Sequence, residues 1–336
     1  MASTKDIKRE LSRRVDIVMQ PQCLESQVRP YLKPGAGVNG GWETRVVQLD
    51  GTGAATLEIG YGSHPRVFAK LYPDESGPLI YEKLNTLRAG GFGSGERYQA
   101  VEPLGFIPEY GMLLTEAAEG LPVSAHIGVN EGAVLAGARE AAVWLAKLHS
   151  TPLRIGTPRA LLDAGELLPL ARRLAKTLCR RPQFLGQALE MIEALEDLAA
   201  NTVEGLQVQG HGQYRPIHVF IGPSSVTVID LDRSRPCDPA RDVAEFLHRL
   251  RMTTFWHGGS VEPANAPTEA FLAAYSSEVT DGACLSNLRF HWARYIFHSF
   301  NHKMKDTSSS DLEVDSVVRF YRSEFDHAIN GRFNGS

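Results

Sequence analysis

The chain has 336 residues, 43% hydrophobic and 22% charged, and its 35 basic and 39 acidic residues leave a formal net charge of -4. This length predicts two domains or one large bilobal domain, and the near balance of charge excludes a surface that attracts nucleic acid or membrane lipid as a whole. No apolar run reaches the roughly 18 residues that a membrane span requires, and the charged start of the chain does not have the pattern of a signal peptide. Four widely spaced cysteines predict reduced thiols and a cytoplasmic location.

The first 120 residues have mainly the alternating pattern of β-strands. The turn residues Asp50-Gly51-Thr52-Gly53 separate two alternating segments and predict a hairpin. Glycines at 90, 91, 93 and 95 predict the end of the single helical segment. We therefore expect strands over 43–49, 54–60, 66–72 and 112–117, a helix over 79–87 and a charged helical arm over 1–25.

Beyond residue 120 the apolar residues change to helical spacing. In Val134–His149 the apolar positions recur at steps of three and four, which predicts an amphipathic helix with one buried face. Other helices are expected over 168–179, 184–202, 242–250, 268–278, 284–302 and 312–329. Two short strands, 219–221 and 226–230, are joined by the turn Gly222–Ser225 and interrupt the helices.

These segments together predict an α+β fold of two lobes, a small antiparallel sheet with one helix over 1–120 and a larger, mainly helical lobe over 121–336. The densest group of chemically active side chains lies at 207–242, within the second lobe. A loop with two imidazoles, His211–His218, precedes the short hairpin, and Asp230 and Asp232 follow its second strand. Two carboxylates one residue apart at a strand end suit a hard cation such as Mg²⁺.

The segment 207–242 resembles the catalytic and metal-binding loops of the aminoglycoside phosphotransferase and choline kinase-like family. His211-Gly212, Asp230-Leu231-Asp232 and Asp238–Ala244 match that family's pattern in order and spacing. Further upstream, Val67–Lys70 resembles the family's strand with the phosphate-binding lysine, and Glu82 resembles the partner of that lysine. Leu113–Gly120 resembles the interlobe hinge, and Trp144–His149 resembles a buried helix of the family. The resemblance covers residues 40–250 and implies a bilobal, protein-kinase-like fold.

The same resemblance implies transfer of the γ-phosphoryl group of ATP or GTP to a small-molecule acceptor. Lys70, held by Glu82, would contact the phosphates, and backbone groups of Glu116 and Ala118 would bind the base. Mg²⁺ would be held by Asp230 together with His218 or Asp232. No membrane or nucleic-acid partner is expected, and the acceptor, the choice of ATP or GTP and the oligomeric state stay open.

Two residues depart from the family pattern. Gln213 stands at the position of the catalytic aspartate, and His218 stands at the position of the metal-binding asparagine. An amide cannot accept the proton of a substrate hydroxyl, although it can orient a nucleophile by hydrogen bonding. Three interpretations follow: a kinase for an already ionised acceptor, a kinase with His218 or His211 as its base, or a pseudokinase that binds nucleotide without transfer. An enzyme that transfers a nucleotidyl group is a further alternative.

Several other residues have a structural interpretation beside the functional one. His211 and Asp242 are expected to brace the loop, and His149 to be a core histidine. Either Gly35–Gly40 or the turn at 50–53 could cover the phosphates, and the sequence does not choose between them. The basic residues His291, Arg294, His298 and His302 recur on one helical face and indicate either an acceptor-binding surface or the solvated side of a core helix.

Overall fold

We analysed a computed structural model, which describes residues 4–33, 40–49, 53–160, 182–203, 206–304 and 311–331. The chain divides into two compact units. Unit 1 comprises Met1–Leu121 and Phe220–Asp232, and unit 2 comprises Pro122–Val219 and Arg233–Ser336. The predicted helix at 168–179, the turn at 50–52 and most of the glycine-rich segment 35–40 lie outside the described residues.

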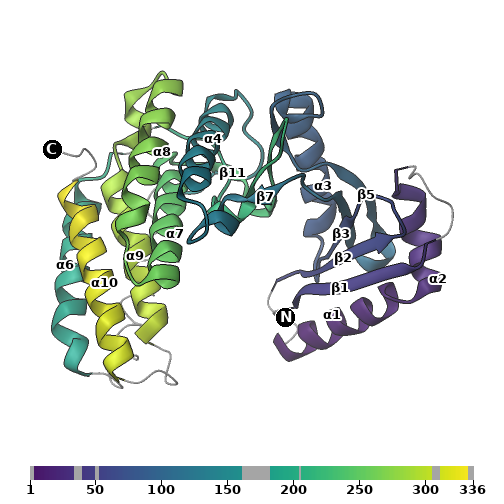
Figure 1. Ribbon diagram of the computed structural model, residues 1–336, viewed down its shortest axis with the longest axis horizontal. Coiled ribbons are helices and arrows are strands. Elements are labelled where there is room, and N and C mark those ends of the chain that lie inside the picture. Colours follow the sequence, from purple (N-terminus) through teal and green to yellow (C-terminus); the bar gives the residue numbers. More distant parts are fainter. Residues whose placement is uncertain are drawn as a thin grey trace. The chain divides into compact units, whose positions relative to one another are not determined.

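Unit 1 is built on a five-stranded antiparallel sheet of order β1-β2-β3-β6-β5 (Figure 1). The strands are β1 (Trp42–Leu49), β2 (Ala55–Tyr61), β3 (Val67–Leu71), β5 (Pro103–Ile107) and β6 (Met112–Glu116). In β3, Val67, Ala69 and Leu71 are buried, whereas Phe68 and Lys70 are half-buried on the opposite face. The alternation of a strand therefore places Lys70 on the face away from the apolar core.

The core of unit 1 includes the N-terminal arm. Helix α1 (Thr4–Val18) lies along the sheet (Figure 1), followed by the short α2 (Pro21–Cys23), a π-helical turn at Leu24–Val28 and a 3₁₀ turn at Arg29–Tyr31. Leu11, Val15 and Val18 of α1 are buried in one cluster with the apolar face of β2 and β3. Helix α3 (Ser76–Leu87) packs against β5 and β6, and a π-helical turn at Arg88–Phe92 ends it. The expected arm is thus part of a hydrophobic core.

A second sheet brings a late segment of the chain into unit 1. Its strands are β4 (Tyr98–Ala100), β10 (Val226–Val228), β9 (Val219–Ile221) and β7 (Leu121–Pro122), in that order. Val226 of β10 pairs in parallel with Tyr98 of β4. The segment Phe220–Asp232 therefore belongs to unit 1, which corrects the expectation that all of 207–242 lies in the second lobe.

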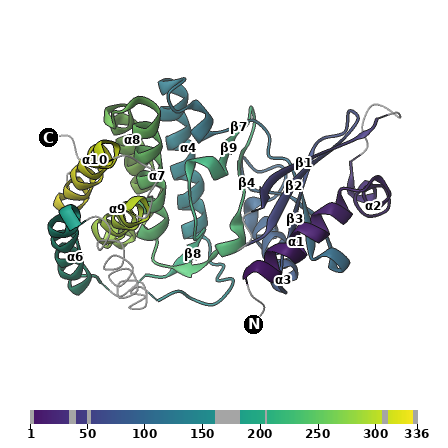
Figure 2. The same ribbon diagram turned by 90° about the horizontal axis from the view of Figure 1, so that it is seen from below.

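Unit 2 is mainly helical. Its helices are α4 (Glu131–Ser150), α6 (Leu185–Ala200), α7 (Ala240–Gly258), α8 (Asn265–Glu278), α9 (Leu288–Met304) and α10 (Asp311–Asn330). The strands β8 (Val208–Gly210) and β11 (Arg235–Cys237) form a small antiparallel pair. Helix α9 packs against α7 on one side and against α6 and α10 on the other (Figure 2).

Local signals explain the ends of two of these helices. The Asn130 side chain accepts a hydrogen bond of 3.0 Å from the Ala133 N–H and caps the start of α4. Helix α7 ends at Gly259, whose φ of 72° lies in the left-handed region that glycine adopts without a steric penalty. The expected α+β architecture, a small antiparallel sheet followed by a mainly helical region, is confirmed. No helix of the described part of the chain combines the length and apolarity that crossing a membrane requires.

Candidate functional site

Lys70 joins two aspartates in unit 1. Its Nζ lies 2.7 Å from Asp230 Oδ1 and 2.7 Å from Asp232 Oδ2. The side chains are only partly exposed, 26% for Lys70, 24% for Asp230 and 23% for Asp232. Burial opposes the charge of Lys70, but the carboxylates of Asp232 and Asp230 outweigh it and raise the lysine's pKa. We name these three residues the Lys70 cluster.

The backbone at Asp230 is unusual. Its φ of 63° makes it the non-glycine residue with a positive φ in the described part of the chain. Aspartate tolerates this left-handed conformation better than most residues, at a cost of about 1 kcal/mol. This turn follows β10, and the carboxylates of Asp230 and Asp232 both reach Lys70 from it. Strain of this kind is common at functional sites and points to a functional role for Asp230.

Tyr72 and Lys83 complete the surroundings of Asp232. The Tyr72 hydroxyl donates to both Asp232 carboxylate oxygens at 3.1 Å. Burial, together with the charge of Asp232, raises the pKa of Tyr72 far above its ordinary value, so it remains a neutral donor. Lys83 Nζ donates to the backbone carbonyl of Asp232 at 2.9 Å. Tyr72 follows Lys70 by two residues on the same strand face, a spacing from which it could have been predicted.

The expected partner of Lys70 on α3 does not pair with it. Ile80, Leu84 and Leu87 form the buried face of this helix, which leaves Glu82 exposed. The adjacent Lys83 is half-buried and is the α3 residue that contacts Asp232. The two aspartates, and not Glu82, are therefore the ionic partners of Lys70 in this structure.

In unit 2 the loop after β8 is held by a buried carboxylate. Asp242 accepts hydrogen bonds from the backbone N–H groups of His211, at 2.6 Å, and Gly212, at 2.9 Å. Gly212 has a φ of 82°, and an added Cβ would lie 2.3 Å from the Arg233 carbonyl oxygen. His211 is fully buried, and its Nδ1 accepts from the Gln213 N–H at 3.2 Å. His211 and Asp242 are therefore loop braces.

Gln213 is held by an arginine. With its amide oxygen directed at the Arg215 guanidinium, the separations to Nη1 and Nη2 are 2.9 and 3.0 Å. Arg215 Nε in turn donates to Glu245 Oε1 at 2.6 Å. This orientation directs the amide NH₂ of Gln213 away from Arg215. An amide held in this way can donate a hydrogen bond to an acceptor oxygen but cannot remove its proton.

His218 lies close to Gln213 and His211 of the loop. Its Nδ1 is 3.0 Å from the Gln213 carbonyl oxygen, and its ring stacks on His211 with centroids 6.0 Å apart. A carbonyl only accepts, so Nδ1 carries the proton and Nε2 of the neutral ring carries the lone pair. His218 thus has the tautomer that a base or a metal ligand needs.

Comparison with known protein families identifies the family of the chain. The profile of the phosphotransferase enzyme family matches residues 35–291. The chain belongs to this family. No curated protein sequence matches the chain significantly.

Solved structures show the same fold as this phosphotransferase. A choline kinase from Cryptosporidium parvum Iowa II matches with a TM-score of 0.56 and 11% identity over 87% of this chain and 91% of its own. A thermostable mutant of an aminoglycoside phosphotransferase matches with a TM-score of 0.58 and 12% identity, covering 93% and 99%. An ADP-bound aminoglycoside phosphotransferase gives a TM-score of 0.50 and 16% identity over 86% and 95%. The chain thus has the kinase-like fold of these structures.

Two of the expected metal ligands, Asp230 and Asp232, both contact Lys70 in unit 1. No group of three or more histidine, cysteine, aspartate or glutamate side chains is positioned to hold a metal within the residues that the structure describes. In unit 1 the carboxylates of Asp230 and Asp232 are both paired with Lys70. Their four oxygens are the donors that Mg²⁺ prefers, so the residues present fit that ion.

The expected hinge residues of the phosphotransferase lie at the end of β6. The Glu116 N–H donates to the Glu102 carbonyl at 2.9 Å, and the Ala117 N–H donates to the Arg66 carbonyl at 3.1 Å. The Glu116 carboxylate pairs with Lys33 Nζ at 2.6 Å. Only the carbonyl of Glu116, and not its N–H, can therefore contribute to binding a base at this position.

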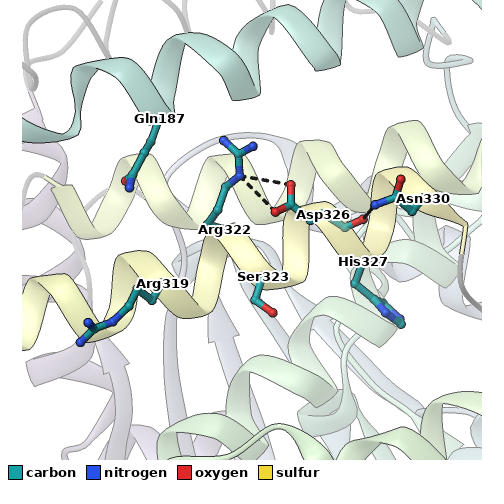
Figure 3. Close-up of a pocket in the computed structure, with 7 residues that line it drawn as sticks. All are labelled: Gln187, Arg319, Arg322, Ser323, Asp326, His327 and Asn330. Atoms are coloured by element: carbon teal, nitrogen blue, oxygen red, sulfur yellow. Dashed lines mark hydrogen bonds and ion pairs between the residues drawn. The ribbon is translucent and has the colours of Figure 1, made fainter.

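A surface pocket of about 500 Å³ lies elsewhere in unit 2, between α6 and α10 (Figure 3). It is lined by Gln187 and by six α10 residues, Arg319, Arg322, Ser323, Asp326, His327 and Asn330. Its central cation, Arg322, pairs with Asp326 and with Glu190 of α6. None of the sequence-predicted site residues line this pocket, so it does not enter the candidate site.

Proposed function

We propose that the chain transfers the γ-phosphoryl group of ATP or GTP to a small-molecule acceptor. The observation that carries this proposal is the Lys70 cluster, in which one lysine and two aspartates from segments 160 residues apart converge at 2.7 Å. A lysine placed against two carboxylates is suited to phosphate binding because it can exchange one set of anionic oxygens for another.

The nucleotide would be held by residues of unit 1. Lys70 would contact the phosphates, and Asp230 and Asp232 would hold Mg²⁺, which when bound neutralises phosphate charge. Tyr72 keeps the Asp232 carboxylate in place by its hydroxyl hydrogen bonds. The Glu116 carbonyl and the Ala118 N–H would bind the base. Because backbone groups would make these contacts, they are compatible with either ATP or GTP.

The acceptor step would depend on the loop of unit 2. Gln213 would orient the acceptor through its amide NH₂, while Arg215 fixes the amide oxygen. Phosphoryl transfer depends mainly on positioning and charge neutralisation, so an acceptor that is already ionised needs no base. His218, with its Nε2 lone pair, is the candidate base or additional metal ligand if the acceptor is neutral.

The test measures nucleotide binding and transfer separately. Mg-ADP binding is followed by calorimetry, and transfer by mass spectrometry of a mixed acceptor library incubated with ATP or GTP. Asp230→Asn and Lys70→Met should each reduce turnover by about 10²–10³-fold, the usual effect of removing an electrostatic contact in phosphoryl transfer. Matched controls are Asp197→Asn and Lys8→Met, which alter exposed helix residues.

The outcomes separate the alternatives. An acceptor that gains the mass of a phosphate supports the proposal, whereas one that gains a nucleotide shows nucleotidyl transfer. Mg-ADP binding without any transfer identifies a pseudokinase, an alternative favoured by the engagement of Gln213 with Arg215. If no nucleotide binds and Asp230→Asn changes nothing, the proposed function is wrong.

A further inference from the structure

A lysine of α3 contacts the backbone of the turn at residues 230–232. Lys83 Nζ donates to the Asp232 carbonyl oxygen at 2.9 Å and to the Leu231 carbonyl oxygen at 3.4 Å. The Lys83 side chain is half-buried, so water competes only in part for these contacts. A hydrogen bond from a charged donor is roughly twice as strong as one between neutral groups. Lys83 therefore ties α3 to the segment that carries Asp230 and Asp232.

Helix α3 is itself anchored against β5 near both of its ends. At its start Gly77 packs closely on this strand, because a Cβ added there would lie 2.5 Å from the Phe106 ring. Just past its end, the Arg88 guanidinium pairs with Glu102, the residue before β5, at 3.0 Å. An anchored helix gives the Lys83 side chain a fixed origin. The sheet therefore determines where the ammonium group of Lys83 can hold the turn.

The turn requires such an anchor because its backbone is strained. Asp230 has a φ of 63°, and a non-glycine residue keeps this conformation only where its surroundings enforce it. Two residues later, the Tyr72 hydroxyl holds the carboxylate of Asp232 and Lys83 holds its carbonyl. Tyr72 directly follows β3. The turn is thus held from the sheet by Tyr72 and from the helix by Lys83.

The two lysines at the turn contact different groups. Lys70 pairs with carboxylate oxygens of Asp230 and Asp232, which are the donors that Mg²⁺ prefers. The hydrogen bonds of Lys83 to the turn end on carbonyl oxygens and use no carboxylate oxygen. A metal at the two aspartates therefore competes with Lys70, whereas it is compatible with these bonds of Lys83.

The helical geometry of α3 explains why Lys83, and not Glu82, acts on this site. Neighbouring residues of an α-helix point about 100° apart around its axis. With Ile80 and Leu84 buried, Glu82 is exposed and Lys83 is half-buried. Helix α3 therefore contacts the turn that carries the aspartates through a cation, and it does not contact Lys70 through a carboxylate.

We propose that Lys83 is a positioning residue that holds the turn at 230–232 so that Asp230 and Asp232 can bind Mg²⁺. The role of that ion in binding nucleotide rests on the proposed phosphotransfer, whereas the hold on the turn rests on the contacts of Lys83. Positioning and simple electrostatics predict opposite signs. Removing a positive charge near a metal site strengthens cation binding by itself, whereas releasing the turn weakens it.

The first test measures binding of Mn²⁺, which takes oxygen ligands as Mg²⁺ does, by electron paramagnetic resonance. Nucleotide-free Lys70→Met is the reference, because it lacks the lysine that pairs with the carboxylates. Adding Lys83→Met should raise the Mn²⁺ Kd about tenfold, the effect of losing one charge-assisted hydrogen bond. Adding Lys83→Arg, which keeps a charged donor, should restore most of the affinity. Glu82→Gln and Lys8→Met, both at exposed positions, are the matched controls and should leave the Kd nearly unchanged.

The second test keeps Lys70 and uses ADP. Lys83→Met should raise the Mg²⁺ concentration that half-saturates Mg-ADP binding about tenfold. The affinity for ADP in the presence of EDTA should stay close to that of wild type, because the turn acts through the metal. A general loss of structure would lower both affinities, so the ratio of the two separates positioning from unfolding. This test also keeps the inference falsifiable if Lys70→Met fails to fold.

Several outcomes would overturn the inference. They are no Mn²⁺ binding by Lys70→Met, unchanged or tighter Mn²⁺ binding after Lys83→Met is added, and an equal loss of ADP affinity with and without metal. The Mn²⁺ titration involves no nucleotide, so it judges Lys83 independently of phosphotransfer. Weaker Mn²⁺ binding on adding Lys83→Met, in a chain whose wild type binds no Mg-ADP, supports the role of Lys83 and contradicts the proposed function.

Discussion

The two units differ in how closely they follow the family they share. In unit 1 the Lys70 cluster retains the lysine and both aspartates that the family resemblance implies. In unit 2 the corresponding loop keeps its scaffold, Asp242 and His211, but carries Gln213 at the position of the base. The residues proposed to bind the nucleotide therefore follow the family pattern, whereas Gln213, which is proposed to orient the acceptor, departs from it. Such a division is expected when a fold keeps its cofactor and changes its substrate.

The largest effect should come from removing the brace of the altered loop. Asp242→Ala leaves the backbone N–H groups of His211 and Gly212 without their acceptor, so we expect a loss of about 4 kcal/mol in the free energy of unfolding. Denaturant titration measures it, with the exposed Asp197→Ala as the control. Transfer should be lost while Mg-ADP affinity is retained; a parallel loss of Mg-ADP affinity would show that the two regions are not independent.

The stability of the protein should depend on pH through His291 of unit 2, which is neutral in the folded state. Its folded pKa of about 4 is below the unfolded value, so it contributes stability above about pH 6.5 that is lost as the pH falls toward 4. A difference of this size amounts to about 3 kcal/mol. Thermal unfolding between pH 7 and pH 4 should show a smaller acid loss in His291→Gln than in wild type. Equal losses in both proteins contradict this role.

Replacing Gln213, the residue that departs from the family pattern, sharpens the comparison. Gln213→Asp places a carboxylate beside Arg215 and removes the amide donor. For an ionised acceptor we expect turnover to fall about 10²-fold, because the new carboxylate repels the acceptor and cannot donate to it. Steady-state turnover measures this, and Gln213→Glu is the size control. A gain of turnover would instead identify a degenerate kinase that acts on a neutral hydroxyl.

The smallest effect is expected in unit 1. Tyr72→Phe removes the hydroxyl donor to Asp232 and keeps the ring. The loss of one hydrogen bond to a carboxylate should weaken Mg-ADP binding by about 1.5 kcal/mol, roughly tenfold. Calorimetry measures it, and Tyr98→Phe in β4 is the control. An unchanged affinity would mean that the Tyr72 hydroxyl does not position Asp232.

Much of the fold could be predicted because its signals are local. The alternation in 66–72 and the three-and-four spacing of Val134–His149 each depend on a few neighbouring residues, and both correspond to elements of the structure. The assignment of Phe220–Asp232 to the second lobe was wrong because it rested on order along the chain. The parallel pairing of Val226 with Tyr98 is a long-range contact that periodicity does not encode.

The sequence by itself determined the fold class, the family and the identity of Lys70, Asp230 and Asp232 as a group. Only the tertiary structure decided their pairing, because Lys70 and Asp230 lie 160 residues apart and Glu82 is turned to solvent by the buried face of α3.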